Sequence, residues 1–568
     1  MTFVTGNNSI DSLLYSSWNP VAGQAVSLTY SFLTRVPADA TSDDANGFKA
    51  MTAGQQQGVR EALATWAAVA NISFTEAASG GDIQIGTNDQ GTQSSGYAYL
   101  PGSGSVSLFT NNKNTYNFSF ADGDFGIAVL IHELGHTLGL KHPGDYDSTG
   151  TSIEGPFLPA ATDNVDYTQM SYNTGAGFKL NGNYGITPML YDIQAMQYLY
   201  GANMSYHTGA DTYSFGRDAA LQCIWDAGGT DTLDFSSCST ATIINLNAGS
   251  FSETAPGYNN ISIAYNVTIE RAIAGSGGST IYANAGGNVI IGGAGSDIIH
   301  EGAGNDQITG GGGRDTVIFD KGFSAFTVGG SLAALTVSGD GVDTLNGIAT
   351  LKFSDRTIEL ANFDAVQGGT ANADVLVAGA GNELITGGAG IDVLKFSGAR
   401  SGYQVGANGA GFIVADQLGS GGTDLLSGIE RLQFADGSGV ALDIGGAAGQ
   451  TYRLYQAAFN RTPDAGGVGF WLDQLDHGLT LLKMSQFFLD SPESVRTYGA
   501  LDNTAFVNLI YANVLHRAPD ASGLDFYLHG FDAGQFTRAQ VLQGFSESPE
   551  NQAAVIGSIT NGVTYTIV

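Results

Sequence analysis

The sequence predicts a multidomain chain, with a helix-containing N-terminal domain, stacked glycine-rich strand modules and an all-α C-terminal domain. The 568 residues exceed what one hydrophobic core organises. Many of the 82 glycines follow a nine-residue period that begins near residue 274. From about residue 447 glycines become rarer and apolar residues take helical spacing. Collagen is excluded because no sustained three-residue period occurs.

The charge balance is strongly acidic. The 53 acidic and 21 basic residues give a net charge of −32, which argues against nucleic acid or an anionic membrane as a partner. Calcium is the more natural counterion, although charge alone also favours solubility. The first residues lack the basic start and apolar run of a signal peptide. No run of about 18 apolar residues predicts a membrane span.

The most informative segment is HELGHTLGLKH at 132–142. The preceding FGIAVLI predicts a helix, on which His132 and His136, four residues apart, share one face. Gly139 can end this helix in a left-handed conformation, so that the chain turns back and brings His142 to the same point.

Three neutral imidazole nitrogens with an open fourth position predict a catalytic site for one zinc ion. Glu133 follows the first ligand, where a carboxylate can take a proton from an activated water. An amphipathic helix with incidental histidines is the alternative, and the added glycine and third histidine make it much the weaker one.

The extended motif resembles that of the metzincin metalloproteases, which is followed by a methionine-containing turn. YTQMSY at 167–172 supplies such a turn. The resemblance implies that Met170 forms a hydrophobic floor beneath the metal. It also implies that Tyr172 ligates zinc at rest and moves to stabilise the oxyanion during the reaction.

Within the metzincins, the first half of the chain resembles the serralysin family of secreted bacterial proteases. The resemblance is carried by IDSLLYSSW, LTYSFL, VREALATWAAVANISF, PMLYDIQAMQYLYGAN and IWDAGGTDTLDFS. It implies an α/β (α+β) protease domain over 1–204, endopeptidase activity and protein or peptide substrates. Extended substrate is expected to add as a strand near SGYAYLPG at 95–102. Serralysins usually carry a short propeptide; here the match begins within about ten residues of Met1, so the chain has almost none or is trimmed.

The nine-residue repeats each predict a six-residue glycine turn and a three-residue strand. Their eighth position is apolar and is expected to point inward: Ile281, Ile290, Ile299, Ile308 and Val317. Their sixth position carries a carboxylate in three consecutive units: Asp297, Asp306 and Asp315. Carboxylates and turn carbonyls on flexible loops are ligands that calcium prefers.

The pattern returns 77 residues later with Asp374, Glu383 and Asp392. Similar blocks at 342–355 and 423–436 follow the two sets, so the sequence predicts a duplicated module, over 205–365 and 366–446. Each module resembles the RTX parallel β-roll, or β-sandwich, in which neighbouring turns share several structural Ca²⁺ ions. The carbonyls expected to contribute are those of Gly293, Gly295, Gly302 and Gly304.

The family resemblance implies further calcium ligands at the junction after the protease domain: Asp211, Asp226, Asp231, Thr268 and Glu270. The only two cysteines, Cys223 and Cys238, lie in the same region. Whether they form a disulfide or stay as buried thiols is left open.

The C-terminal domain, 447–568, is itself duplicated. Arg461 and Pro463 match Arg517 and Pro519 at a shift of 56, and each half predicts a helix, an RxPD turn and a second helix. It resembles a helical domain of unassigned activity found in RTX-type and surface-layer-associated exoproteins. Binding or anchoring and a spacing role are equally compatible with it.

The resemblance implies secretion through the type I apparatus, which reads an uncleaved C-terminal signal. Ile567 and Val568 supply an apolar end, while Tyr565 stands where an acid is common. The sequence thus predicts a secreted, calcium-dependent zinc endopeptidase, with surface-layer or other exported proteins as further candidate partners. The alternative is a surface-associated calcium-binding or adhesive protein with a vestigial protease domain.

Overall fold

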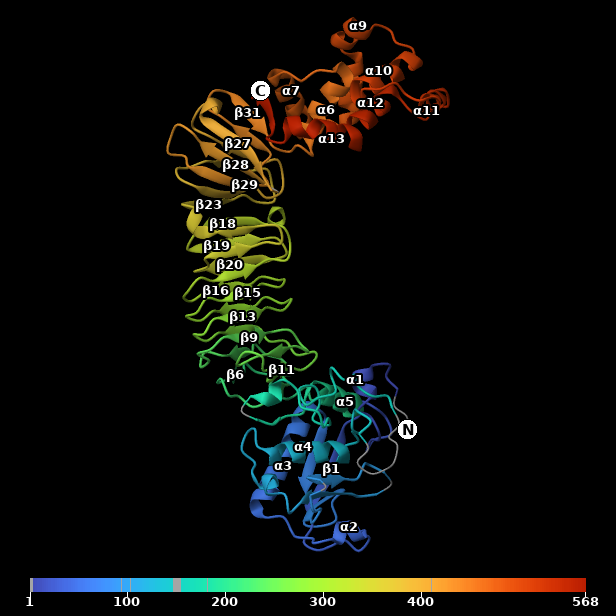
Figure 1. Cartoon of the computed structure of the whole chain (residues 1–568), viewed down its shortest axis with the longest axis vertical. Helices are drawn as coiled ribbons and strands as arrows, with labels where there is room; N and C mark the ends of the chain where they lie inside the picture. The colour runs from blue at the N-terminus through green and yellow to red at the C-terminus, as the bar shows by residue number, and fades with distance from the viewer. Residues whose placement is uncertain (1–3, 93, 103, 147–154, 181, 410) are drawn as a thin grey trace. The chain divides into compact units, whose positions relative to one another are not determined.

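The computed structural model describes the chain except for residues 1–3, 93, 103, 147–154, 181 and 410. It divides into two compact units, residues 1–318 and residues 319–568 (Figure 1). This division falls inside the module predicted over 205–365, and the four-part domain layout stays a prediction.

The N-terminal part of the first unit is a five-stranded sheet of order β2-β1-β3-β5-β4. Four strands pair in parallel and β4 is an antiparallel edge. Their bounds are β1 Val26–Phe32, β2 Ile72–Glu76, β3 Ile83–Asn88, β4 Gly96–Ala98 and β5 Val106–Asn111. This parallel sheet with helices agrees with the α/β character that the family resemblance implied.

Two long helices pack together beside this sheet, α3 (Ala53–Val69) and α4 (Phe125–Thr137) (Figure 1). Thr52 and Gln55 form a reciprocal capping box that fixes the start of α3. Trp66 is fully buried and its indole N–H donates to the carbonyl of Ile131 in α4 at 3.2 Å. Helix α5 (Leu190–Tyr200) and the short helices α1 (Asn8–Asp11) and α2 (Ser42–Ala45) complete the α-helical part.

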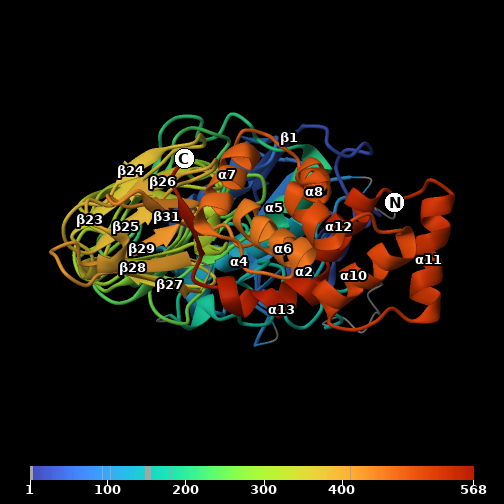
Figure 2. The ribbon, with the colours of Figure 1, turned by 90° about the horizontal axis from the view of Figure 1, so that it is seen from above.

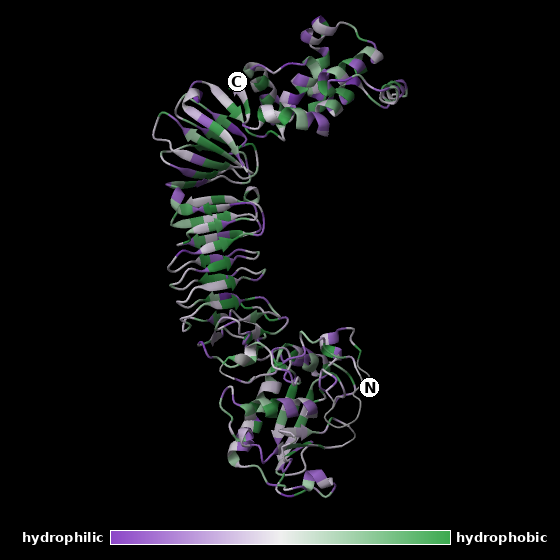
Figure 3. Ribbon diagram, viewed as in Figure 1, coloured by the Kyte–Doolittle hydropathy of each residue, from purple (hydrophilic) through white to green (hydrophobic). Residues whose placement is uncertain are grey.

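The remainder of the first unit contains short strands stacked in two parallel sheets (Figure 1). Successive repeats alternate between the sheets, so residues 18 apart pair, as Ile281 does with Ile299. All five predicted inward positions are fully buried. Hydrophobic residues follow the strands (Figure 3). One sheet contains β6 Thr212–Ser214, β8 Thr232–Asp234, β12 Arg271–Ile273, β14 Val289–Ile291 and β16 Gln307–Thr309. The other contains β9 Thr242–Asn245, β13 Ser279–Tyr282, β15 Ile298–His300 and β17 Thr316–Ile318.

Strands β7 Gln222–Ile224, β10 Phe251–Ser252 and β11 Ile261–Ile263 form a small separate sheet in the first unit. The second unit begins with an antiparallel set, β18 Thr327–Ser331, β19 Ala334–Ser338 and β20 Val342–Asn346, and with the hairpin of β21 Thr350–Lys352 and β22 Thr357–Glu359.

The second repeat set forms two five-stranded sheets in this unit. In the first, β27, β28 and β29 lie side by side (Figure 2). Its members are β23 Ala365–Gly368, β25 Glu383–Thr386, β27 Tyr403–Asn408, β28 Gly411–Asp416 and β29 Thr423–Ser427. The second sheet contains β24 Val375–Val377, β26 Val393–Lys395, β30 Arg431–Gln433, β31 Ser438–Ala441 and β32 Val563–Thr566.

Strand β32 differs from the all-α prediction for 447–568. It pairs antiparallel with β31, Val440 opposite Thr564, and so adds the last described segment to the second repeat module. Val563 and Tyr565 are buried while their neighbours are exposed, a period-two pattern that favours a strand.

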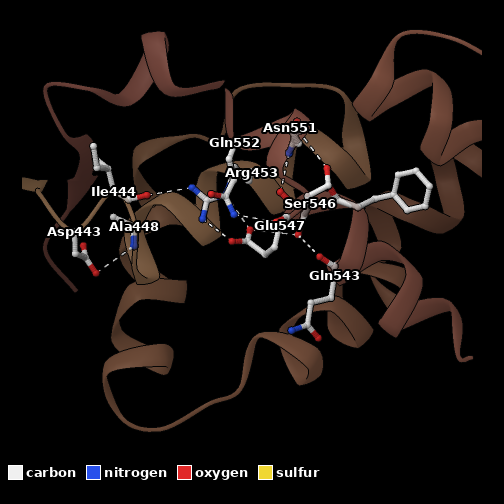
Figure 4. Close-up of polar contacts among 11 residues, drawn as sticks. Asp443, Ile444, Ala448, Arg453, Gln543, Ser546, Glu547, Asn551 and Gln552 are labelled. Atoms are coloured by element: carbon white, nitrogen blue, oxygen red, sulfur yellow. Dashed lines mark hydrogen bonds and ion pairs between the residues drawn. The ribbon is translucent and has the colours of Figure 1, made fainter. Parts of the chain in front are cut away.

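The helices between β31 and β32 repeat one capping scheme. Asp464 and Asp520 each accept a backbone N–H at the start of a helix, so the aspartate of each RxPD turn caps the second helix of its half. A partly buried ion pair of Arg453 with Glu547 joins α6 to the end of α12 (Figure 4). The helices are α6 Ala447–Phe459, α7 Ala465–Asp476, α8 Leu481–Asp490, α9 Pro492–Tyr498, α10 Asn503–Leu515, α11 Ala521–Asp532, α12 Arg538–Ser546 and α13 Pro549–Ile559.

Candidate active site

Helix α4 and the turn after it bring the three predicted histidines together. The helix ends at Thr137, and Gly139 adopts a φ of +114° that favours glycine. A β-carbon at Gly139 would lie 2.1 Å from the carbonyl oxygen of Ser16, so the turn also needs glycine for space. His142 then returns to the helix face that carries His132 and His136.

The ring nitrogens of these histidines are arranged for a cation. His132 Nδ1 donates to the carbonyl of Gln169 at 2.7 Å, and His136 Nδ1 donates to that of Leu140 at 2.8 Å. Because a carbonyl can only accept, both neutral rings present an Nε2 lone pair. These two Nε2 atoms lie 3.2 and 3.1 Å from His142 Nε2.

This geometry fits zinc. Neighbouring nitrogens of a tetrahedral zinc ion with bonds of about 2.0–2.1 Å lie about 3.3 Å apart. Burial lowers the pKa of all three histidines, that of His142 to about 3, so the rings are neutral at physiological pH. The trio is one of the few groups among the described residues that could hold a metal ion.

Glu133 is a buried carboxyl group beside the histidine trio. Its side chain is 6% exposed, and its Oε2 has no hydrogen-bond partner among the described residues. Burial raises its pKa to about 8 in the absence of a cation. A metal ion at the histidines would favour the charged form. Such a carboxyl group suits proton transfer better than structural bonding.

Met170 lies under α4, as the family resemblance implied for the methionine turn. It is fully buried, and a β-carbon at Gly135 would come within 2.6 Å of its sulfur. Gly135 stands between His132 and His136 on α4, so the turn contacts the helix at the centre of the histidine site.

The sequence analysis missed Asp192, which holds this turn in place. Asp192 is fully buried and accepts from Thr168 Oγ1 at 2.5 Å and from the backbone N–H groups of Gln169 and Met189 at 2.7 and 2.9 Å. Gln169 in turn accepts from His132. Asp192 therefore orients His132 through the backbone of Gln169, whose N–H and carbonyl group make the two bonds. Its place in the first turn of α5 was the available signal.

Tyr172 is 54% exposed and covers the histidines. Its ring centroid lies 4.5 Å from that of His142, and it stacks on Tyr146 at 4.9 Å. An exposed tyrosine next to the ligand rings has room to move, as the implied oxyanion role requires.

The edge strand β4 lies where the sequence analysis expected substrate to bind. Gly96 faces Glu133, while the side chains of Tyr97 and Tyr99 bond to Asp44 through their hydroxyl groups, at 2.7 and 3.1 Å. Asp44 is buried and thus anchors the strand from the side away from Glu133. Hydrogen bonds from Tyr97 and from Thr41 lower the pKa of Asp44 despite its burial.

The repeat carboxylates form a ladder through the first unit. The N–H of Asp297 donates to Asp315 at 2.8 Å, and the N–H groups of Ser279 and Asn288 donate to Asp297 and Asp306 at 2.6 Å. The second oxygen of Asp315 is buried without a partner among the described residues. Unsatisfied buried oxygens of this kind suit a calcium ion.

The predicted turn glycines pack tightly against neighbouring turns. A β-carbon on any of them would meet a backbone atom of the turn below: Gly293, Gly295, Gly302 and Gly304. In the second set, Asp374 donates its N–H to Asp392 at 2.7 Å, and Glu383 is buried and accepts from Gln367 and the N–H of Gly379. Asp374 and Asp392 lie directly before a strand, at the end of a turn, whereas Glu383 is the first residue of strand β25.

The junction residues form a linked acidic group. The N–H of Asp211 donates to Asp231, and that of Asp231 donates to Glu270 at 2.7 Å. Asp211 and Asp226 also lie with His207, a residue missed by the sequence analysis, in a group whose ligand atoms are within 4.8 Å. Thr268 is exposed two residues before Glu270.

The two cysteines are free and buried. Of the two arrangements left open by the sequence, the structure has the unpaired thiols.

Every helix among the described residues is too short or too polar to cross a bilayer.

Comparison with known families agrees with this geometry. The matrixin family model matches residues 28–153, and the model described as peptidase M10 serralysin C terminal matches residues 191–427. A domain of unknown function (DUF4214) matches residues 484–555.

Several curated proteins are similar to the first half of the chain. Serralysin C of Dickeya chrysanthemi is 42% identical over 47% of this chain and 61% of its own length. Serralysin of Proteus mirabilis is 37% identical over 47% of this chain and 62% of its own length. Metalloprotease AprA of Pseudomonas entomophila is 37% identical over 46% of this chain and 59% of its own length. The chain thus spans less than two thirds of these relatives. The chain is thus similar to the matrixins over its N-terminal region and to the serralysin C terminus over the region that follows.

Proposed function

We propose that the protein is a zinc endopeptidase. The observation that carries this proposal is the convergence of three neutral imidazole nitrogens beside an unpaired, buried Glu133. His132, His136 and His142 would hold one zinc ion, with Tyr172 as a further ligand at rest. When bound, zinc polarises the scissile carbonyl and lowers the pKa of water.

The chain's own residues supply the remaining chemistry. Glu133 takes the proton of the attacking water and passes it to the leaving amine. Tyr172 donates a hydrogen bond to the oxyanion that forms at the scissile carbonyl. The edge strand β4 pairs with an extended protein or peptide substrate, which brings the scissile bond next to Glu133.

The carboxylate ladders would bind several structural Ca²⁺ ions. The support is the buried, unpartnered oxygen atoms of Asp231 and Asp315 and the fixed spacing of the turns. Low calcium in the cytosol would leave these modules unfolded, and higher calcium outside would fold them. Such folding would suit secretion through the type I apparatus, and surface-layer or other exported proteins stay candidate partners. The four domains would be 1–204, 205–365, 366–446 and 447–568.

Cleavage of casein tests the peptidase. The wild-type chain is expected to cleave casein, and activity should fall by at least about 10³-fold in Glu133→Ala and after zinc chelation. Equal activity of wild type and Glu133→Ala would refute the mechanism. An inactive wild type with a full complement of zinc would instead favour the adhesive, calcium-binding alternative.

A further inference from the structure

The two strand-rich blocks that follow the repeat sets differ at one corner. Their first segments align at the same shift of 77 residues as the repeats, because the short 3-10 helices η3 (Phe323–Ala325) and η5 (Arg400–Gly402) match at that shift. Beyond them the lengths diverge. Three residues, 339–341, join β19 to β20, whereas six residues, 417–422, join β28 to β29. The second block therefore carries a longer loop on an otherwise matching set of strands.

In the first block, two side chains link the short turn to the segment after β17. Lys321 Nζ forms an ion pair with Asp340 Oδ2 at 3.3 Å. The ring of Phe326 packs against Gly339, whose β-carbon position would lie 2.3 Å from Cδ1 of that ring. A long charged side chain and an aromatic ring thus occupy this corner.

The second block has smaller or more polar residues at the matching positions. At the shift of 77, Gly398 stands in the place of Lys321, and Tyr403 stands in the place of Phe326. The ion pair is therefore lost, and a cavity of about 340 Å³ lies beside both residues. Small-molecule sites span about 300–1,000 Å³, so this cavity is large enough for one small ligand.

The wall of the cavity is rich in hydroxyl and carboxyl groups. Tyr403 Oη accepts the N–H of Gly398 at 3.2 Å, and its own O–H can donate to a ligand. Phe396 adds an aromatic ring. The described residues that line the cavity include no lysine, arginine or histidine. The polar side chains of the wall are Ser397, Ser401, Tyr403, Asp416, Ser420 and Asp424.

The long loop is held in place by Asp416. Its Oδ1 accepts the N–H groups of Leu418 and Gly419 at 2.9 and 2.8 Å, and its Oδ2 accepts that of Gly421 at 3.0 Å. These three bonds lower the pKa of Asp416 and occupy its charge within the loop. The wall is thus formed before a ligand arrives, which reduces the cost of ordering it on binding.

Asp424 is the buried carboxyl group of the wall. It is 3% exposed, and its Oδ1 accepts the N–H of Glu383 at 3.0 Å. Burial and the charges of Glu383 and Asp416 raise the pKa of Asp424 to about 7, so near neutral pH it can donate as well as accept a hydrogen bond. Among the described residues, neither Asp416 nor Asp424 belongs to a group with the spacing of a metal site. An uncharged ligand that forms hydrogen bonds therefore fits better than a metal ion.

We propose that this cavity binds one unit of a neutral sugar. The hydroxyl groups of a pyranose match the hydroxyl and carboxyl groups of the wall, and its C–H face suits the rings of Phe396 and Tyr403. Phosphate, sulfate and acidic sugars are disfavoured, because the described lining offers them no basic side chain. Such a site would let the second unit hold the chain on a substrate or surface that carries glycans.

Sugar binding to the full-length chain, in the presence of calcium, tests the proposal. The probes are D-glucose, D-galactose, D-mannose and N-acetyl-D-glucosamine, followed by saturation-transfer-difference NMR and isothermal calorimetry. At least one of them is expected to bind saturably, with a Kd of about 1 mM or tighter. Methylammonium is the charged comparison. Saturable binding of none of the four sugars, or of methylammonium alone, would overturn the proposal.

Two variants locate the binding in this cavity. Ala378→Leu adds a side chain at the wall and is expected to weaken sugar binding by at least about 10-fold. Ala407→Leu, at an exposed position of β27 in the same block, is the matched control and should keep wild-type affinity.

Tyr403→Phe installs the residue of the first block and removes one hydroxyl group. It is expected to weaken binding by about 3- to 10-fold. This variant decides the test if Ala378→Leu does not fold, which thermal unfolding in calcium would show. Wild-type affinity in folded Ala378→Leu, or in Tyr403→Phe, would exclude the cavity as the sugar site.

Discussion

Gly96 on the edge strand β4 lies directly against the carboxyl group of Glu133. A β-carbon at residue 96 would be 2.9 Å from Glu133 Oε1, closer than van der Waals contact allows. The absence of a side chain at this position therefore fixes where the proposed base can stand.

Gly96→Ala is expected to displace Glu133 and to lower kcat by about 10- to 100-fold, because small misplacements of a catalytic group are costly. Zinc content, measured by mass spectrometry, should not change. Gly54→Ala in α3 is the control, since nothing lies within 4 Å of its β-carbon position. Unchanged kcat in Gly96→Ala would show that the carboxyl position is not critical.

Tyr172→Phe is expected to lower kcat by about 10²-fold with little change in KM, because the lost hydroxyl would act only on the oxyanion. Steady-state cleavage of a fluorogenic peptide measures both constants. Tyr116→Phe, at a residue that is 73% exposed, is the comparison. A change in KM alone would assign Tyr172 to substrate binding instead.

Asp192→Asn is expected to weaken zinc binding by about 10- to 100-fold, because Gln169 would no longer be held for its bond to His132. Competition with a chromogenic chelator measures the affinity. The exposed residue Asp490 provides the control Asp490→Asn. An unchanged zinc affinity would separate the methionine turn from metal binding.

Removal of calcium is expected to reverse the pH dependence of stability in the second unit. Burial raises the pKa of Asp424 to about 7 from 3.8. Without calcium, the folded chain therefore holds a proton that the unfolded chain has lost, and stability falls as pH rises from about 4 to 7. Calcium is expected to bind the repeat carboxylates in their charged form, so its stabilising effect should be larger at pH 7.5 than at pH 5. Thermal unfolding followed by circular dichroism, in chelator and in calcium, measures both trends; a stability that rises with pH in chelator would contradict the prediction.

Cys223 and Cys238 are expected to react with iodoacetamide only after denaturation, without any reductant. Burial raises the pKa of Cys223 to about 12, which suppresses the reactive thiolate in the folded chain. Mass spectrometry counts the labels. Labelling that requires prior reduction would demonstrate a disulfide.

The sequence predicted those features whose signals are local. The spacing of His132, His136 and His142 and the inward position of Ile299 follow from the period of one helix and of one repeat. Asp192 escaped prediction because its partners in the methionine turn, Thr168 and Gln169, lie 24 and 23 residues before it. The pairing of β32 with β31 was missed for the same reason, since the helices lie between these two strands.

That pairing makes the helices α6–α13 an insertion between two adjacent strands of one sheet. The two ends of the helical region are therefore held at neighbouring positions of one sheet. Unfolding of the helices acts on both strands that flank them, β31 and β32. The sheet cannot reach its full width during synthesis until more than a hundred intervening residues have left the ribosome. Truncation of the chain after β31 would remove β32 with the helices and leave β31 as a bare edge open to pairing with another chain.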